Sequence, residues 1–222
     1  MSIQRYYPIS FERISDKEIT EWKTIPSAIA GDSMNRQQVM AARIKPLSPG
    51  TVLVGQARCV DAVEGDNAAI HAAISFLEPG DVLVINGGGL ENRAVWGGIL
   101  TSLARRRKVA GVVLDGAVRD LAELKEDDFP IFAVAASPAG PSKGWGGIID
   151  GAISCGGVSV HPGDLIIGDD DGVAVVPLAR HETVLKTAKE RLAFEADVLD
   201  RLEKGEDTAS IFGLPEIVEI EN

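Results

Sequence analysis

Arg119 and Asp120 stand side by side in the chain, and Glu123 follows three residues later. Arginine has a planar guanidinium that grips a carboxylate through two parallel hydrogen bonds. An aspartate suits Mg²⁺, which keeps most of its water and often takes only one or two carboxylates. On a short helix from Arg119 to Lys125, Glu123 would share a face with Asp120 and hold a metal-bound water. This spacing indicates a site for a small carboxylate and a hard metal ion; the simpler structural interpretation is a helix start with a solvated arginine.

A glycine-dense stretch, residues 86–98, follows an apolar run at 82–85 and is interpreted as a loop. It does not match the dinucleotide fingerprint G-x-G-x-x-G, because Asn92 stands where the last glycine belongs, and no P-loop motif occurs. Gly97 and Gly98 are expected to begin a helix, whose free N–H groups and dipole favour an anion. The alternative is that these glycines serve only a tight connection between a strand and a helix.

Other potential metal ligands do not form a recognised motif. Residues 169–172 read Asp-Asp-Asp-Gly, but a Ca²⁺-binding loop needs alternating carboxylates and a glutamate at its twelfth position, which is Leu178 here. An acidic hairpin turn is expected instead. The three histidines form no HxxxH or HxH pair and the two cysteines no CxxC pair, so zinc is not expected. These residues are His71, His161, His181, Cys59 and Cys155.

Three proline-glycine turns each lead into an apolar run that predicts a buried strand. The turns lie at 49–50, 79–80 and 162–163, and the strands at 52–54, 82–86 and 165–167. The strand at 82–86, a helix at 98–108 and a strand at 111–115 form a βαβ unit, which implies two parallel strands. A turn at Asp115-Gly116 then leads to the short helix of Arg119. The glycine stretch and the Arg-Asp pair are therefore expected at the ends of neighbouring strands.

The remaining pattern predicts one α/β domain with a mixed sheet, an extra β layer and a C-terminal helix. Residues 15–45 are expected to be mostly helical, with Ser15 as N-cap and breaks at Pro26 and Gly31. A helix is expected at 66–77, a strand at 130–137, a loop at 138–147 and hairpins at 148–177. The charged segment 178–204 predicts a long helix that serves as an outer layer or an oligomer arm. The core of the single domain, residues 1–222, is placed at about 25–177.

Composition limits the class of protein. The 222 residues are 45% hydrophobic, enough to bury a full core in one domain. A formal net charge of −11 argues against a nucleic-acid surface, which needs clustered basic residues. No run reaches the roughly 18 apolar residues of a membrane span, residues 1–15 lack the layout of a signal peptide, and two cysteines are too few for a disulfide framework. We therefore expect a cytoplasmic protein that binds neither nucleic acid nor membrane.

Three segments resemble the family that joins 4-hydroxy-4-methyl-2-oxoglutarate aldolase with the regulator of RNase E activity A (RraA). They read PGDVLVINGGGLENRAVWGG, GVVLDGAVRDLAEL and CGGVSVHPGDLIIGDDDGVAVVP, and the likeness spans about residues 25–205. The spacing from Gly98 over twenty residues to Arg119-Asp120, followed by Glu123, is similar to the family motif. The resemblance implies the RraA-like fold, a swivelling β/β/α-type single domain.

The same resemblance implies a class II pyruvate aldolase that depends on Mg²⁺ or Mn²⁺ and also decarboxylates oxaloacetate. Asp120 would ligate the metal, and Arg119 would bind the 2-oxo acid substrate. Members of the family are trimers or dimers of trimers, so Glu195 of a neighbouring subunit would join Glu123 in the metal's outer shell. The pyruvyl carboxylate would be held by the backbone of four residues, Gly97, Gly98, Ile99 and Leu100.

One departure from the family bears on the substrate. The dedicated aldolases carry an aspartate where this chain has Gly98, and Glu123 is expected to replace that outer-shell acid. A class I mechanism would need a buried lysine, but Lys108, Lys125 and Lys143 stand in polar or loop contexts, so the metal route is preferred. The alternative function is that of an RraA-type protein inhibitor of ribonuclease E without catalytic activity, since an acidic surface suits a basic partner.

Overall fold

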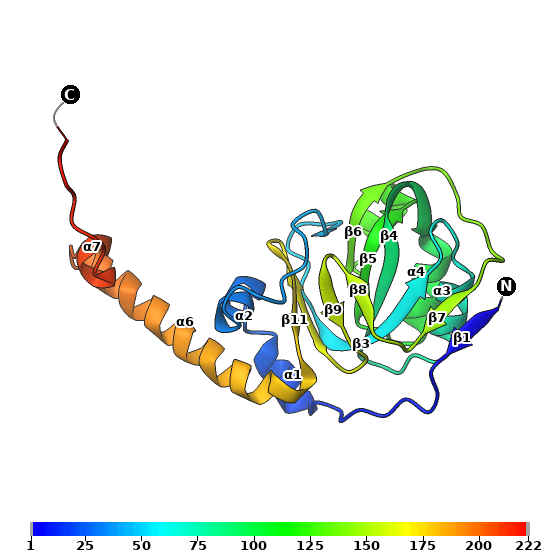
Figure 1. Cartoon of the computed structure of the whole chain (residues 1–222), viewed down its shortest axis with the longest axis horizontal. Coiled ribbons are helices and arrows are strands. Elements are labelled where there is room, and N and C mark those ends of the chain that lie inside the picture. The colour runs from blue at the N-terminus through cyan, green and yellow to red at the C-terminus, as the bar shows by residue number, and fades with distance from the viewer. Residues whose placement is uncertain (1, 221–222) are drawn as a thin grey trace.

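The computed structural model describes residues 2–220, which form a β-rich body and a long helical arm (Figure 1). The helices are α1 (Asp16–Trp22), α2 (Ser27–Ser33), α3 (Ala68–Ile74), α4 (Gly98–Arg106), α5 (Leu121–Glu126), η1 (Leu178–Arg180), α6 (His181–Glu203) and α7 (Thr208–Phe212). The strands are β1 (Ile3–Arg5), β2 (Lys45–Pro46), β3 (Leu53–Ala62), β4 (Asp81–Trp96), β5 (Gly111–Val118), β6 (Ile131–Ala136), β7 (Gly147–Ile149), β8 (Ile153–Cys155), β9 (Val158–Val160), β10 (Leu165–Asp169) and β11 (Gly172–Val176).

A nine-stranded mixed sheet organises the body, as expected. Its strand order is β1-β7-β3-β4-β5-β6-β2, with the β10–β11 hairpin joined to β3. Strands β3, β4, β5 and β6 run parallel, whereas β7 and β10 pair antiparallel with β3, and β2 pairs antiparallel with β6. Strand β1 pairs parallel with β7. The β8–β9 hairpin forms a separate two-stranded layer. The parallel strands bring their carboxyl ends to one edge, and loops at that edge are where open α/β sheets bind ligands.

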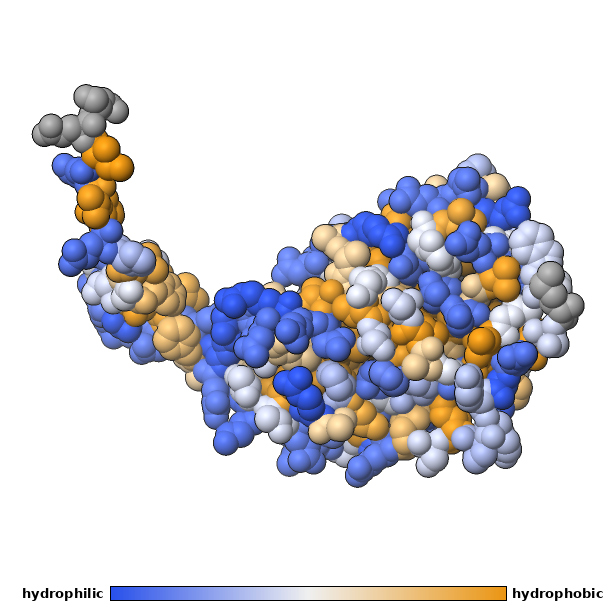
Figure 2. Space-filling view, viewed as in Figure 1, coloured by the Kyte–Doolittle hydropathy of each residue, from blue (hydrophilic) through white to orange (hydrophobic). Residues whose placement is uncertain are grey.

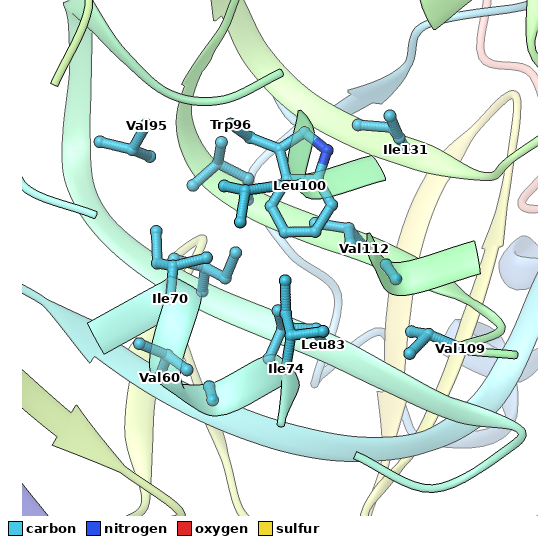
Figure 3. Close-up of a cluster of buried hydrophobic side chains, with 14 of the residues drawn as sticks. Val60, Ile70, Ile74, Leu83, Val95, Trp96, Leu100, Val109, Val112 and Ile131 are labelled. Atoms are coloured by element: carbon cyan, nitrogen blue, oxygen red, sulfur yellow. The ribbon is translucent and has the colours of Figure 1, made fainter. Parts of the chain in front are cut away.

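The two faces of the parallel strands bury different cores. Leu83 and Val112 point to the side of α3 and α4, where they pack against Ile70, Ile74 and Leu100 (Figure 3). Alternate residues of the same strands face the β8–β9 hairpin instead. Strands covered on both faces are expected to be apolar throughout, which is why these runs lack the polar alternation of a half-exposed strand.

The segment predicted to be helical at 15–45 is helical only to Ser33. Asn35, Arg36 and Gln38 adopt left-handed backbone conformations that end the helix and turn the chain. The chain then runs along β11, where the N–H of Met40 donates to the carbonyl of Val173. The prediction was wrong for residues 34–45 because pairing with an otherwise open strand edge prevailed over local helix propensity. Ser15 does cap α1, in a reciprocal capping box with Glu18.

The glycine stretch is not a loop, and Asp115-Gly116 is not a turn. Strand β4 runs through the glycines to Trp96, with register shifts against β5 after Asn86. Gly88 and Gly89 have φ values of 70° and 69°, so the glycines allow bulges within a strand. Asp115 lies inside β5, where it pairs with Asn86 of β4, and its carboxylate is held by Arg43 and the N–H of Gly156.

The amino-terminal segment is tied to the sheet by a buried ion network. Arg58 of β3 donates to both carboxylate oxygens of Asp150, at 2.8 Å each, and lies 3.3 Å from Asp81. Arg5 also donates to Asp150, and Arg13 to Asp81. Burial alone would lower the pKa of the Arg58 guanidinium, but the hydrogen bonds and charges of both aspartates outweigh it and raise that pKa. Two short stretches near residue 5 and residue 13 are therefore fixed to the body.

The C-terminal helix α6 is anchored at one end and projects at the other (Figure 1). Val184, Leu185 and Ala188 are buried in a core shared with α1, α2 and the β10–β11 hairpin. Farther along, Phe194 contacts Phe212 of α7, with ring centroids 6.2 Å apart. Exposed apolar side chains gather towards the tip of this arm, as Figure 2 shows. Across residues 2–220, no helix combines the length and apolarity needed to cross a membrane.

Candidate functional site

Arg119 and Asp120 lie where β5 leaves the sheet, beside the end of β4. The N–H of Arg119 donates to the carbonyl of Trp96 at 2.9 Å, which holds the two strand ends together. The indole N–H of Trp96 donates to the hydroxyl of Thr101 on α4, so strand and helix are fixed relative to each other. The sequence-predicted meeting of the glycine stretch and the Arg-Asp pair therefore takes place at the carboxyl edge of the sheet.

Asp120 has a left-handed backbone conformation, with φ 60° and ψ 36°. It stands at the N-cap of α5, yet its side chain does not cap that helix. Instead, its Oδ2 accepts a hydrogen bond from the N–H of Gly98, at 3.0 Å, across the gap to α4. Left-handed conformations are sparsely populated for residues other than glycine and concentrate at functional sites. The strained backbone thus aims this carboxylate at the start of α4.

Arg119 extends beside this carboxylate without a close ion pair. Its Nε lies 3.6 Å from Asp120 Oδ2, and the two side chains are 38% and 39% exposed. A Cβ at Gly97 would lie 2.5 Å from Asp120 Oδ2 and 3.0 Å from Arg119 Cγ, and one at Gly140 would lie 2.9 Å from a guanidinium nitrogen. Gly97 therefore leaves room for the Asp120 carboxylate and the Arg119 side chain, and Gly140 leaves room for the guanidinium. An arginine held so loosely keeps most of its donors for a bound anion.

The Glu123 carboxylate lies over the first residue of α4. A Cβ built on Gly98 would lie 2.6 Å from Glu123 Oε1 and 2.7 Å from Oε2, so any side chain at position 98 would displace the carboxylate. Glu123 is the third residue of α5, while Asp120 is its N-cap, so the predicted helix begins two residues later than expected. The two acids nevertheless approach α4 from the same end of α5.

The first turn of α4 forms the mouth of a pocket. Ile99 is 73% exposed there and Leu100 is buried, and both line the pocket together with Gly97. Because the first N–H groups of a helix have no intrahelical acceptor, those of Ile99 and Leu100 are available to an anion. The N–H of Gly98 was expected to serve the same purpose, but it donates to Asp120.

Two further elements complete the pocket, which encloses about 360 Å³ with its open mouth. Asn67, the N-cap of α3, and His71 of the same helix line one side, and Pro141 and Lys143 come from the loop at 138–146. The Nδ2 of Asn67 donates to the carbonyl of Val95 at 3.1 Å, whereas its Oδ1 is buried without a partner among the described residues. A buried carbonyl oxygen of this kind is costly unless a ligand or water donates to it.

Sequence reasoning missed His71 as a member of the site. Burial lowers the pKa of its imidazole, and the positive charge of Lys143 lowers it further, so the ring is neutral at neutral pH. One signal was available, because His71 stands on a short helix that follows a strand of the parallel sheet. Such helix starts lie at the carboxyl edge, where the site is.

Glu195 is not part of this pocket within one chain. It lies on α6, 3.9 Å from Arg191, on the arm that projects from the opposite side of the body to α4 (Figure 1). Of the residues singled out from the sequence, the structure brings together Arg119, Asp120, Glu123 and the four residues from Gly97 to Leu100.

The donor atoms of the pocket suit a hard divalent cation. The Asp120 carboxylate has one oxygen, Oδ1, that accepts no hydrogen bond within residues 2–220, and the Oδ1 of Asn67 lacks a partner as well. Both are oxygen ligands, which Mg²⁺ and Mn²⁺ prefer over nitrogen or sulfur. Asp120 thus fits a metal ligand, and Asn67 and Glu123 fit groups that hold metal-bound water.

A second group of potential ligands, Glu18, His181 and Glu182, lies between α1 and α6, with donor atoms within 4.8 Å of one another. Glu18 is already engaged by the N–H and hydroxyl of Ser15. Three lysines also line the adjoining depression, which disfavours a cation there: Lys17, Lys186 and Lys189. The cysteines fit no catalytic role either, because burial raises the pKa of Cys59 well above its ordinary value and that of Cys155 to about 12.

The fold and the site together indicate the class of proteins that unites aldolases and RraA proteins. The features are a mixed sheet, an aspartate in a left-handed conformation beside an arginine, and a helix that begins at a glycine. The chain belongs to the RraA-like family, described as Aldolase/RraA, whose pattern matches residues 13–175. A relative from Halalkalibacterium halodurans, named provisionally as a 4-hydroxy-4-methyl-2-oxoglutarate aldolase, is 41% identical over 175 residues, which cover 79% of this chain and 83% of the relative.

Solved structures agree with this assignment. An unusual member of the RNase ES inhibitor RraA family from Streptomyces coelicolor superposes with a TM-score of 0.77 at 27% identity, covering 85% of this chain and 100% of that one. The RNA-processing inhibitor RraA from Thermus thermophilis gives a TM-score of 0.63 at 31% identity, covering 68% of this chain and 92% of that one. The expected RraA-like fold is therefore confirmed.

Proposed function

We propose that this protein is a divalent-metal-dependent lyase of 2-oxo acids. It would cleave 4-hydroxy-4-methyl-2-oxoglutarate-type substrates to pyruvate and decarboxylate oxaloacetate. The observation that carries the proposal is the left-handed Asp120, whose strained backbone directs a carboxylate to the start of α4 beside an uncommitted Arg119. The likeness to a relative named for the aldolase supports the same reaction.

Asp120 would hold Mg²⁺ or Mn²⁺ through its free oxygen. When bound, the cation would supply Lewis-acid stabilisation of negative charge on the 2-oxo group. Glu123 lies over Gly98, where a side chain would begin if position 98 carried one. This placement supports the view that Glu123 replaces the outer-shell acid of the dedicated aldolases. Asn67 would offer its unpartnered Oδ1 to water in the same pocket.

Arg119 and the N–H groups of Ile99 and Leu100 would bind and orient the carboxylate next to the 2-oxo group. Both proposed reactions leave negative charge on the same three-carbon unit, because each breaks the bond to C3 of a 2-oxo acid and yields the enolate of pyruvate. A guanidinium and helix N–H groups fixed in advance stabilise such charge more effectively than reorganising water does. One constellation therefore suffices for both substrates.

Aldol cleavage also needs a base for the 4-hydroxyl proton, whereas decarboxylation does not. The Glu123 carboxylate, exposed beside the start of α4, is placed to accept that proton through a water. The hydroxyl oxygen then becomes a carbonyl, the C3–C4 bond breaks, and a proton returned to C3 completes pyruvate. Loss of Glu123 should therefore impair cleavage more than decarboxylation.

The proposal includes assembly into a trimer or a dimer of trimers. The projecting arm carries Glu195 away from the pocket of its own chain, with its side chain about half exposed. An acid on such an arm can reach a site only in a neighbouring subunit. There it would add to the outer shell around the metal.

A ribonuclease E inhibitor without catalytic activity is the second candidate. Two observations favour it: the similarity to RraA structures and the net charge of −11, which suits a basic partner. A pure binder has no need of the strained Asp120, so the enzyme is preferred. Capture of the nuclease by this chain, equal in metal and in chelator and without lyase activity, would favour the binder.

The test is pyruvate release from oxaloacetate and from 4-hydroxy-4-methyl-2-oxoglutarate, followed with lactate dehydrogenase. The assay is run with Mg²⁺ and with excess chelator, and the release by metal alone is subtracted. Chelator-sensitive release supports the metal lyase, and the ratio of the two rates separates aldolase from decarboxylase. Absence of release above background from both substrates would contradict the proposal.

A further inference from the structure

Asp66 lies just before α3, and its carboxylate is fully buried. Its Oδ2 accepts hydrogen bonds from the N–H groups of Gly144, at 2.7 Å, and Trp145, at 3.1 Å. Its Oδ1 accepts one from the N–H of Ala68, at 2.8 Å. A single side chain thus joins the first turn of α3 to a loop more than seventy residues later. Neither Asp66 nor these three partners lines the pocket.

Backbone hydrogen bonds continue the connection on both sides of this carboxylate. The N–H of Asn67 donates to the carbonyl of Ser142, and the N–H of Ser142 donates to the carbonyl of Gly65. Nearer the sheet, the N–H of Ala94 donates to Ala139. The loop at 138–146 is therefore held against α3 and β4 although it contains no helix and no strand.

One side of the pocket is formed by Arg119, Asp120 and the residues of β4 and α4, and the other side is formed by this loop and α3. Asn67 is the N-cap of α3, His71 lies on that helix, and Lys143 stands next to Gly144, the residue that Asp66 holds most closely. Lys143 is close enough to His71 for its charge to lower the pKa of the imidazole. The position of that charge therefore depends on how firmly the loop is tied to the helix.

We propose that Asp66 is a positioning residue, which fixes the loop at 138–146 so that Lys143 is held over the pocket beside His71. The consequence for catalysis rests on the proposed function, but the positioning itself does not. Lys143 then presents a fixed positive charge to a substrate bound by Arg119. His71 presents a neutral imidazole, also held in place, that can form a hydrogen bond with the same substrate.

A carboxylate is the group that this junction requires. Both oxygens of Asp66 accept hydrogen bonds, Oδ1 from the N–H of the helix and Oδ2 from the N–H groups of the loop. Asparagine has only one acceptor oxygen, so its NH₂ group would face N–H donors on one of the two sides. Burial raises the pKa of Asp66, but the N–H groups of Gly144, Ala68 and Trp145 and the charge of Lys143 outweigh it, so the net pKa is lowered. The carboxylate therefore stays ionised at neutral pH.

The titration of His71 followed by NMR reports on this geometry without any assay of activity. The chain has three histidines, so His71→Gln assigns the resonance directly. Other charged groups that line the pocket with His71 are Arg119 and Asp120, and these stay unchanged in every variant. We expect the His71 pKa to rise in Asp66→Asn and in Lys143→Met. In the double variant it should rise no further than in Lys143→Met, because the same charge is lost.

Asp164→Asn is the matched control, since Asp164 is also a buried turn carboxylate that accepts two backbone N–H groups, those of His161 and Leu178. It should destabilise the fold without moving the His71 titration. An unchanged His71 pKa in Asp66→Asn, or an equal rise in Asp164→Asn, would overturn the proposal. If Asp66→Asn does not fold, hydrogen exchange in the unmodified chain decides: the exposed Gly144 and Trp145 should exchange slowly, and rapid exchange would refute the anchor.

Steady-state kinetics extend the test to the proposed reaction. Asp66→Asn and Lys143→Met should each raise KM about tenfold, which corresponds to the loss of one charge-assisted hydrogen bond. The value of kcat should change less in both variants. The control Asp164→Asn should change neither KM nor kcat. Absence of lyase activity in the unmodified chain would count against the proposed function and leave the His71 titration as the test of positioning. A fall in kcat with unchanged KM in Lys143→Met would contradict the placement of Lys143 over bound substrate.

Discussion

Two groups of arginine and aspartate in this molecule have the same chemistry and opposite surroundings. In the buried network, Arg58 grips both oxygens of Asp150, and Asp81 accepts from two arginines. At the candidate site, Arg119 and Asp120 are more than one-third exposed, and their nearest approach is 3.6 Å. Satisfied charges in the interior hold segments of the chain together, whereas the second pair retains unused donors and acceptors for a ligand.

Backbone geometry separates the two groups as clearly as burial does. Arg58 belongs to regular strand β3, while Asp120 is held in a left-handed conformation between β5 and α5. Strain and unsatisfied polar atoms are tolerated where function needs them and are removed elsewhere. The comparison predicts that substitutions in the first group act on stability and those in the second act on activity.

The largest effect should come from Arg58→Met. Removing the cation leaves two buried carboxylates without their shared partner, which costs about 3–5 kcal/mol of unfolding free energy. Urea denaturation measures this cost. Arg36→Met is the control, because Arg36 is exposed and its ion pair with Asp32 is long, at 3.6 Å, so the expected change is within about 0.5 kcal/mol. Equal losses in both variants would break the comparison.

Asp120→Asn should reverse this pattern. Asparagine tolerates the left-handed conformation and can still accept from Gly98, so the midpoint of urea unfolding should stay near that of the unmodified chain. The charge at the metal is lost, and we expect kcat/KM to fall about a hundredfold to a thousandfold. Asp16→Asn, an exposed substitution in the first turn of α1, should leave pyruvate release unchanged. Full activity of Asp120→Asn would remove the aspartate from the proposed site.

Arg119→Lys sharpens the comparison at a smaller scale. Lysine keeps the positive charge but loses the planar fork, so we expect a fall in kcat/KM of about tenfold, mainly through KM. Stability should be unaffected, because the guanidinium forms no close ion pair. Pyruvate release at varied substrate concentration gives both constants. A loss as large as that of Asp120→Asn would indicate that Arg119 acts on the transition state rather than on binding.

The smallest effect is a pH dependence of stability that comes from the site. The folded state lowers the pKa of His71, so it binds fewer protons than the unfolded state, whose histidine titrates near 6.5. The unfolding free energy is therefore expected to decline as the pH falls from above 6.5 through the folded pKa of His71. His71→Gln should flatten this decline, and His161→Gln should not. The lowered carboxyl pKa values, such as that of Asp66, act only at lower pH.

Local chemistry was enough to predict the proline-glycine turns, the acidic hairpin turn and the start of α4, although not the strand conformation of Asp115-Gly116. Proline-glycine pairs preset the entry to β3, β4 and β10, and the acidic stretch at 169–172 does form the predicted hairpin turn. Helix α4 begins at Gly98, as predicted, and Gly97 is its N-cap. These features depend on the conformations that single residues allow, so they can be read without knowledge of the fold.

Long-range pairing explains what the sequence did not reveal. Whether the glycine stretch extends β4 is decided by its neighbour β5, and whether residues 34–45 are helical is decided by the edge of β11. Likewise, the order of strand and helix gives a signal for His71, but nothing near Lys143 in the chain indicates that the two residues meet in one pocket. Their association requires both the sheet order and the anchor at Asp66, which acts across 78 residues.

The ion network at the amino terminus has a practical consequence for where the folded unit begins and ends. The family pattern starts at residue 13 and stops at residue 175, but Arg5 is a partner of the buried Asp150. On the other side, Val184 and Ala188 of α6 lie beyond the pattern, yet they complete a core whose other members lie mostly within it. A truncated chain cut to the region of sequence similarity would lose a charge partner at one end and apolar cover at the other. The segment that must be kept for stable folding is therefore longer than the segment matched by the family pattern.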